Sequence, residues 1–116
     1  MAIPGWPRDL VPPDHEEFVD NSVKWLLDQG PAELRQSPLR LYPLALAMYV
    51  DSFIAGAIEG VRRGYSKTRV NLIGSLEAAQ VEIVQQALAS EGARLVALSR
   101  EIALVTEALQ ESIDHR

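Results

Sequence analysis

The sequence predicts an all-α protein, a long antiparallel helical hairpin with a shorter N-terminal helix. Ala, Leu, Glu, Gln and Arg dominate from residue 43 onward, and these residue types favour helices. No segment shows the strict apolar–polar alternation of a half-buried strand. Between residues 81 and 112, apolar side chains recur three and four positions apart, as in a coiled coil. In a chain of 116 residues this pattern predicts one domain.

Residues 1–13 predict an irregular arm, because four prolines interrupt regular structure there. We expect Trp6 to dock on the helices, since an ordered arm covers apolar surface with such a side chain. The arm has no apolar run typical of a signal peptide. The most apolar stretch, residues 41–58, is interrupted by Pro43 and Asp51 and falls short of the roughly 20 apolar residues of a membrane span. We therefore expect a cytoplasmic protein without a membrane span.

A single helical domain is expected over residues 14–116, and its first helix over residues 14–29. Asp14 and Glu17 stand in capping-box register, which predicts a helix start at Asp14. Gly30 and Pro31 provide the usual helix stop. One further turn is expected in the residues that follow, and then a short segment that ends before Pro43.

The second helix is predicted over residues 43–73. Pro43 suits its first position, where the missing N–H leaves no hydrogen bond unmade. Apolar residues lie on several of its faces, which is typical of a central helix. We expect the helix to continue through Gly64, although a break at this glycine is the alternative. Gly74 and Ser75 predict a two-residue turn.

The third helix is predicted over residues 75–113, continuous through Gly92. Its heptad stripe consists of Val81, Val84, Leu88, Glu91, Leu95, Leu98, Ile102, Val105, Leu109 and Ser112. At about 1.5 Å per residue, the second and third helices would be roughly 45 and 55 Å long. The much shorter first helix is too small to cover the apolar surface of such a hairpin. We therefore predict a homodimer in which two hairpins complete a four-helix core.

The predicted interface combines this stripe with a row of glycines. Gly56, Gly60 and Gly64 lie four residues apart, and each costs a helix about 1 kcal/mol relative to alanine. The row predicts close approach by a partner helix, by Trp25 or by Trp6, with a ligand-sized groove as the alternative. The expected interface residues are Gly56, Gly60, Gly64, Leu88, Leu95, Leu98, Ile102, Val105 and Leu109. The pattern leaves open whether the stripe packs within one chain or between two.

A basic cluster lies on the second helix, where Arg62, Arg63, Lys67 and Arg69 surround Tyr65. Such residues suit phosphate groups or a nucleic-acid backbone, and a tyrosine can stack on a base. The simpler interpretation is a solvated helix face that pairs with acids of the N-terminal half. Because the chain has 16 acidic and 11 basic residues and a net charge of −5, nucleic acid is not the expected partner.

Residues suited to catalysis or metal binding are scarce. The chain has no cysteine and two histidines, His15 and His115. We therefore expect no cofactor, no metal site and no catalytic residue. Asp51 interrupts an apolar helix, which predicts a buried carboxylate paired with Arg40, Tyr42 or an arginine of a second subunit. A ligand-binding carboxylate and simple exposure are the alternatives.

Four short strings resemble a group of short all-helical bacterial proteins to which no activity is attached. They are WLLD at residues 25–28, PLRLYPLALA at 38–47, RRGY at 62–65 and EGARL at 91–95. The resemblance covers most of the chain after residue 20. It implies a single helical domain and assigns no functional residue.

The expected function is a non-enzymatic protein–protein interaction module, built as a homodimeric helical bundle, with another protein as a further candidate partner. The alternative is a module that binds a small ligand, phosphate or nucleic acid through the basic cluster at residues 62–69.

Overall fold

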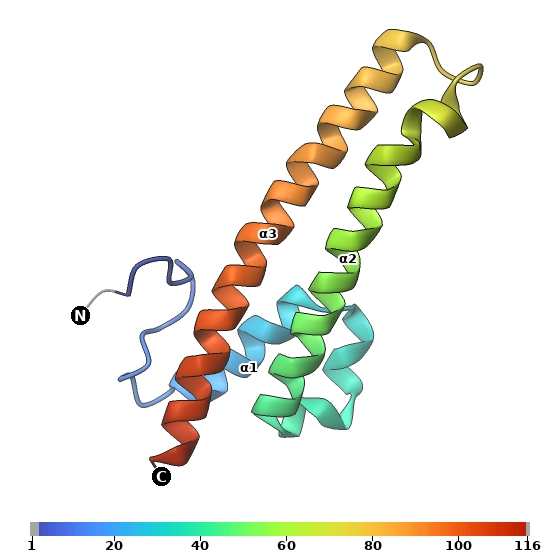
Figure 1. The fold of residues 1–116 in the computed structure, drawn as a ribbon. Helices are drawn as coiled ribbons and strands as arrows, with labels where there is room; N and C mark the ends of the chain where they lie inside the picture. The colour runs from blue at the N-terminus through green and yellow to red at the C-terminus, as the bar shows by residue number, and fades with distance from the viewer. Residues whose placement is uncertain (1–2, 116) are drawn as a thin grey trace.

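The computed structural model describes residues 3–115, and every regular element in that range is helical (Figure 1). The elements are α1 (Phe18–Gln29), the 3₁₀ helices η1 (Ala32–Gln36) and η2 (Pro38–Leu41), α2 (Pro43–Leu72) and α3 (Ala78–Asp114). The all-α prediction is thus confirmed for the described range, and α2 and α3 form the predicted antiparallel hairpin. Residues 1, 2 and 116, which belong to the predicted arm and domain, lie outside the described residues.

The two long helices are continuous through Gly64 and Gly92, as predicted. The turn between them is longer than the two residues expected, because α3 begins at Ala78. Gly74 has φ +91°, a left-handed conformation that ends α2 and that glycine adopts without strain. Glu77 then forms a capping box with Gln80, which places the start of α3 three residues beyond the predicted position.

The first helix begins at Phe18, so the predicted start at Asp14 is wrong. Two successive turns occupy the intervening residues: His15 N–H donates to the Pro12 carbonyl at 3.0 Å, and Phe18 N–H donates to the His15 carbonyl at 3.1 Å. These three-residue steps leave Asp14 outside the helix. No side-chain oxygen caps α1. The expected further turn and short segment correspond to η1 and η2, and Pro43 occupies the first turn of α2 as predicted.

The core lies at the base of the hairpin, the end that contains residue 43 and the C-terminal end of α3. There α1 packs across both long helices, which Figure 1 shows behind the lower half of the hairpin. The buried cluster consists of Leu10, Phe18, Trp25, Leu26, Leu34, Leu46, Ala47, Val50, Ile54, Leu95, Leu98, Ile102, Val105, Ala108 and Leu109. Five members of the heptad stripe, from Leu95 to Leu109, are therefore buried inside one chain.

This burial corrects the predicted interface. Leu95, Leu98, Ile102, Val105 and Leu109 were named as interface residues, with packing inside one chain left open, and they pack against α1 and α2 of their own chain. The physical reason is that α1, although short, lies over the base half of the hairpin, where the stripe is densest. A heptad stripe buries itself equally well in either arrangement, because the side chains require only an apolar partner.

The N-terminal arm packs along α3, and the expected docking of Trp6 is confirmed. The Trp6 ring lies 5.9 Å from the Phe18 ring, between centroids, and its Nε1–H donates to the Leu10 carbonyl at 3.1 Å. Gly5, at φ +80°, approaches the Leu104 side chain. The arm therefore covers Leu104, an apolar side chain of α3 outside the heptad stripe.

The other half of the hairpin has no third helix. We call residues 58–94 the distal segment. It includes the linker at residues 73–77, which forms the tip of the hairpin (Figure 1). Within it only Thr68 and Val81 are buried. Ile73 and Ile83 remain 75% and 65% exposed. The molecule is accordingly elongated, with extents of 59 × 32 × 17 Å.

Candidate interaction surface

One side of the hairpin is left uncovered by α1, and we call it the open face. In Figure 1 it is turned toward the viewer, with α1 behind. On α2 it contains Asp51, Ile58, Arg62 and Tyr65, whose spacings of seven, four and three residues place them in one helix stripe. Val50, one position and about 100° away from Asp51, belongs to the buried side. The open face therefore runs the length of the hairpin beside its core.

Two grooves follow the open face between α2 and α3. The base groove, of about 540 Å³, is lined by Ala47, Met48, Asp51, Ala103, Thr106, Glu107, Gln110, Glu111 and Asp114. The distal groove, of about 310 Å³, is lined by Ile58, Val61, Arg62, Tyr65, Ser66, Leu88, Ala89 and Gly92. Each groove includes two small residues, Ala47 and Ala103 at the base and Ala89 and Gly92 in the distal groove, and small residues permit close approach of a neighbouring helix.

Asp51 is exposed in the single chain, so the carboxylate is not buried by its own chain and the alternative of simple exposure holds there; pairing with an arginine of a second subunit stays a prediction. Asp51 lies one position from the buried stripe and therefore lines the base groove instead of entering the core. No ion pair joins it to another of residues 3–115, and the expected pairing with Arg40 is not formed. The carboxylates of Glu107, Glu111 and Asp114 line the same groove. Four carboxylates thus gather at the base without a lysine or arginine in the groove lining.

The glycine row is only partly packed. A Cβ atom added at Gly56 or Gly60 would meet nothing within 4 Å, whereas one at Gly64 would lie 3.7 Å from a Leu88 methyl. Neither Trp6 nor Trp25 approaches the first two glycines, so close packing within the chain is confirmed for Gly64 alone. Gly56 and Gly60 are exposed on the outer side of α2, away from both grooves.

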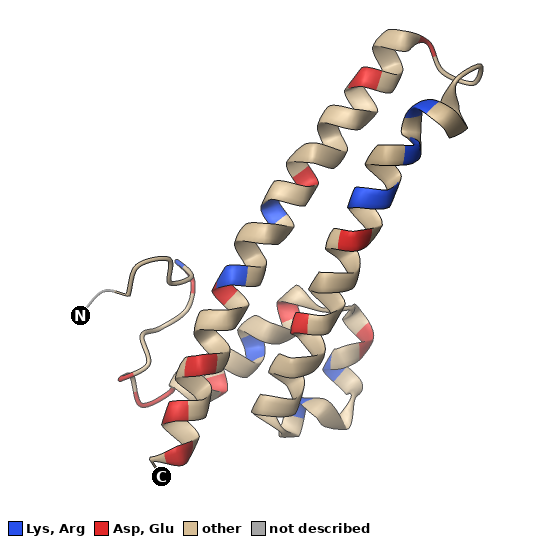
Figure 2. Cartoon of the chain, in the orientation of Figure 1, with Lys and Arg blue, Asp and Glu red and all other residues tan. Residues whose placement is uncertain are grey.

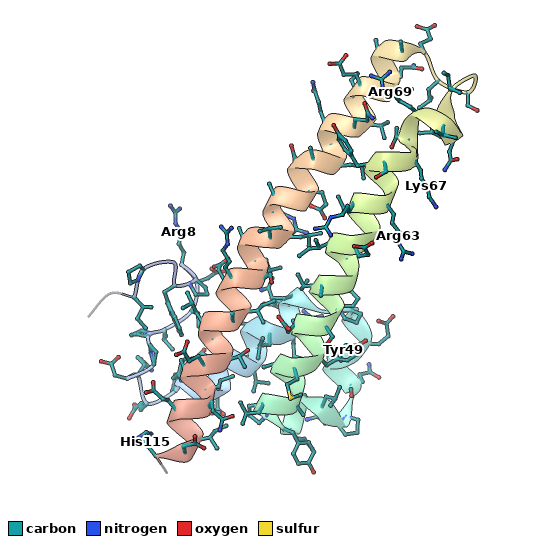
Figure 3. All side chains as sticks on the ribbon, viewed as in Figure 1. Arg8, Tyr49, Arg63, Lys67, Arg69 and His115 are labelled. Atoms are coloured by element: carbon teal, nitrogen blue, oxygen red, sulfur yellow. The ribbon has the colours of Figure 1, made fainter. Side chains whose placement is uncertain are left out.

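The basic cluster divides between two sides of α2. Arg63 and Lys67 extend away from α3 (Figure 3). Arg62 and Arg69, seven residues apart, share the stripe of the open face; Arg62 lines the distal groove, and Arg69 lines a small pocket at the tip. Arg62 and Arg63 each contact Glu59 at 3.3 Å. The four cations therefore do not converge on one anion.

The open face carries opposite charges at its two ends. Arg62 and Arg69 of α2 lie toward the tip, whereas Asp51, Glu107, Glu111 and Asp114 line the groove at the base. Figure 2 shows basic residues on the upper part of α2 and acidic residues on the lower part of α3, with further acidic residues on α2 and on the upper part of α3. The cluster of carboxylates in the base groove was not predicted from the sequence. The spacing of Glu107, Glu111 and Asp114 was the available signal, but Asp51 joins them only through the antiparallel register of the hairpin.

The pKa values of three groups are shifted, and none of these groups lies in the two open-face grooves. The Arg94 guanidinium, which donates to both Glu91 oxygens at 2.7 and 2.9 Å, lowers the pKa of that carboxyl. The same contact raises the pKa of Arg94. Burial, assisted by the charge of Asp9, raises the pKa of Glu101 beside the arm. Residues 3–115 hold no group of three or more His, Asp or Glu side chains arranged for a metal ion.

By length and composition alone, α2 is apolar enough to cross a membrane. Of its most apolar window, 22% is buried inside the protein, so most of that surface faces outward. Comparison with protein families, with curated proteins and with solved structures found no match. The resemblance to short helical bacterial proteins is therefore left as an expectation.

Proposed function

We propose that the protein is a non-enzymatic, cytoplasmic interaction module whose two copies associate through the hairpin. The observation that carries this proposal is the distal segment, where two helical stretches of about nine turns in total run side by side without a third element. Each helix there turns one stripe toward the other, of which only Thr68 and Val81 are buried, and leaves the rest uncovered. A second hairpin would complete a four-helix arrangement in this half of the molecule, while α1 completes the core in the other half.

Exposed apolar side chains support association over an independent monomer. Val70 is 76% exposed and Ile83 65%, and Tyr65 is 46% exposed at the edge of the distal groove. Apolar surface of this kind, surrounded by charged residues, marks interaction sites on soluble proteins. The basic residues diverge, and no acid–base pair or metal cluster occurs in the described grooves, so association fits the surface better than chemistry does.

Sedimentation velocity at micromolar concentration tests this proposal. We expect a species of twice the 12.8 kDa chain mass, in reversible equilibrium with the monomer. A sample that stays at 12.8 kDa across the concentration range would overturn it. Flotation with vesicles of neutral and anionic lipid belongs to the same experiment, because binding of the monomer to vesicles through α2 would assign the uncovered apolar surface to a membrane instead.

A second candidate function is binding of a phosphate-bearing small ligand. Arg62 and Tyr65 line the same groove, which is the observation that favours it. Thermal shift with inorganic phosphate and nucleotides tests it, with Arg62→Ala as the variant that should lose the response. Arg63→Ala is the matched control, because Arg63 extends from the other side of α2.

A further inference from the structure

We infer that the two copies pair antiparallel through the open face, so that Arg62 and Arg69 at the distal end of each chain lie over the acidic base groove of the other. This inference rests on the proposed homodimer and adds to it the face, the orientation and the contacting charges. The occupant is a second copy of this chain, and the argument for it is charge complementarity along one uncovered surface.

The first step is the distribution of charge along the open face. Its base presents the carboxylates of Asp51, Glu107, Glu111 and Asp114. Its distal end presents Arg62, which is 71% exposed at its side chain, and Arg69. One surface that carries opposite charges at its two ends is complementary to its own copy in the reversed direction. In the parallel direction, arginines would meet arginines and carboxylates would meet carboxylates, which is unfavourable.

The second step is the register. Arg62 and Asp51 are eleven residues apart on α2, or about 16 Å along the helix. A two-fold axis that crosses the hairpin midway, at the level of Gly56 and Ala57, therefore places each Arg62 opposite Asp51 of the other copy. The same axis brings Arg69 to the level of the α3 carboxylates, because Asp51 and Glu107 line one groove. Both ends of the interface are satisfied together, as an isologous pairing requires.

The third step is shape. The middle of the open face is lined by small side chains, among them Ala89 and Gly92 in the distal groove and Ala103 in the base groove. Val96, 37% exposed, lies on α3 between the two grooves and supplies an apolar contact near the axis. Small residues along both floors allow two hairpins to approach closely. Val96 and the charged residues of the open face thus meet their counterparts on the second copy.

Charge reversal tests the pairing by sedimentation. The distal variant carries Arg62→Glu and Arg69→Glu, and the base variant carries Asp51→Lys, Glu107→Lys and Glu111→Lys. Each variant alone should dimerise at least about tenfold more weakly than the wild type, because both symmetric contacts become repulsive. An equimolar mixture should recover association, since a distal glutamate then meets a base lysine and the second contact retains its native charges.

The matched control is Arg63→Glu with Lys67→Glu, which changes the same net charge on the outer side of α2. Its dimer affinity should remain within about threefold of the wild type at moderate salt. Loss of the dimer in this control, or a mixture that stays monomeric, would overturn the inference.

Orientation is measured independently with spin labels, because the chain has no native cysteine. A label at Ala79→Cys near the tip should lie about 50 Å from its copy in the antiparallel dimer, and a label at Ala93→Cys within about 20 Å. A short tip-to-tip distance in a stable dimer would overturn the antiparallel pairing while leaving the proposed function intact. A wild-type chain that never dimerises would overturn both.

Discussion

Ser22 is the residue within the described range whose side-chain polar atom is buried without a hydrogen-bond partner. The side chain is fully enclosed in the middle of α1, beside the core. A buried hydroxyl without a partner costs about 1–3 kcal/mol of desolvation, and serine is a poorer helix former than alanine. The position thus lowers the stability of α1, the element that fills the base of the hairpin.

Replacing Ser22 by alanine should therefore stabilise the protein. We expect Ser22→Ala to raise the free energy of unfolding by about 1 kcal/mol and Tm by roughly 4–8 °C, measured by urea and thermal denaturation at a fixed protein concentration. Ser90→Ala, on the exposed surface of α3, gains only helix propensity and should add no more than about 0.5 kcal/mol. A destabilised Ser22→Ala variant would show that the hydroxyl is satisfied after all.

For single residues, the sequence predicts the position of a side chain when only one environment suits it. The prediction fails when a shift of one helix position decides whether the side chain is buried or exposed. Trp6 is an example of success, since few surfaces other than the helical core suit an indole in a proline-rich arm. Asp51 is an example of failure. Its neighbours in sequence are apolar, but 100° of helix rotation separates it from buried Val50 and turns it to the open face.

At the scale of elements, the arm packs on α3 beside Glu101, where a negative charge is unfavourable. Glu101 has a raised pKa, first because burial disfavours its charged form and second because Asp9 adds like charge. An acid whose pKa is raised in the folded state destabilises folding at pH values above that raised pKa. This penalty disappears as the pH falls through the raised pKa to the ordinary value, where the group is neutral in both states.

Glu101→Gln should consequently stabilise the protein at pH 7 and make no difference at pH 3.5. The measurement is urea denaturation at both pH values, with Trp6 fluorescence as a second signal for release of the arm. Glu82→Gln, exposed on α3 away from the arm, should show no such pH-dependent gain. An equal gain for Glu101→Gln at both pH values would mean that the amide improves packing and that ionisation is not the cause.

Substitutions at glycines of α2 and α3 distinguish the outer side of α2 from the contact between α2 and α3. Gly60→Leu should leave the dimer mass unchanged and raise the free energy of unfolding by about 0.5–1 kcal/mol, because the position is open and a helix-interior glycine is unfavourable. Gly92→Leu should lower the free energy of unfolding. Its added Cβ alone would lie 3.4 Å from a Val61 methyl, so a larger side chain separates α2 from α3.

Sedimentation and denaturation of both variants provide the measurement. If Gly60→Leu became monomeric, the outer side of α2 would be the interface in place of the open face.

The lengths of α2 and α3 follow closely from the sequence because Pro43 marks one end and uninterrupted apolar periodicity carries the helices past their glycines. The first residues of the helices are harder to predict from the sequence. The chain before α1 forms two tight turns, and the capping box of α3 uses Glu77 and Gln80 rather than residues of the turn. Several residues near each start satisfy the same capping rules, and only the packing of the turns selects among them.

For the whole molecule, the share of the hairpin that the rest of the chain covers determines which surface is left for an interaction. Six of the ten members of the heptad stripe are buried in the single chain, yet the pattern is identical for burial within one chain and between two. The short α1 and the arm together enclose the base half, which no local pattern indicates. The distal segment keeps the uncovered surface that the sequence analysis assigned to the entire hairpin. The candidate surface therefore moves from the stripe to the open face.

This uneven coverage predicts uneven local stability. In the monomer, backbone amides of the distal segment should exchange hydrogen faster than those of the base, because fewer buried contacts oppose local opening there. Dimerisation should slow exchange in the distal segment as protein concentration rises, since the second copy binds only the closed hairpin. Amides of α1 and of α3 near Ile102, already buried by their own chain, should change less.

Hydrogen exchange read by mass spectrometry at several protein concentrations checks this expectation. The wild type should gain at least about tenfold protection in residues 58–94 between mostly monomeric and mostly dimeric samples. The Arg62→Glu, Arg69→Glu variant should gain none over the same range, because its like charges keep the copies apart. A gain confined to the base half would place the second copy on α1 or the arm, and the two-helix half would then be stable without a partner.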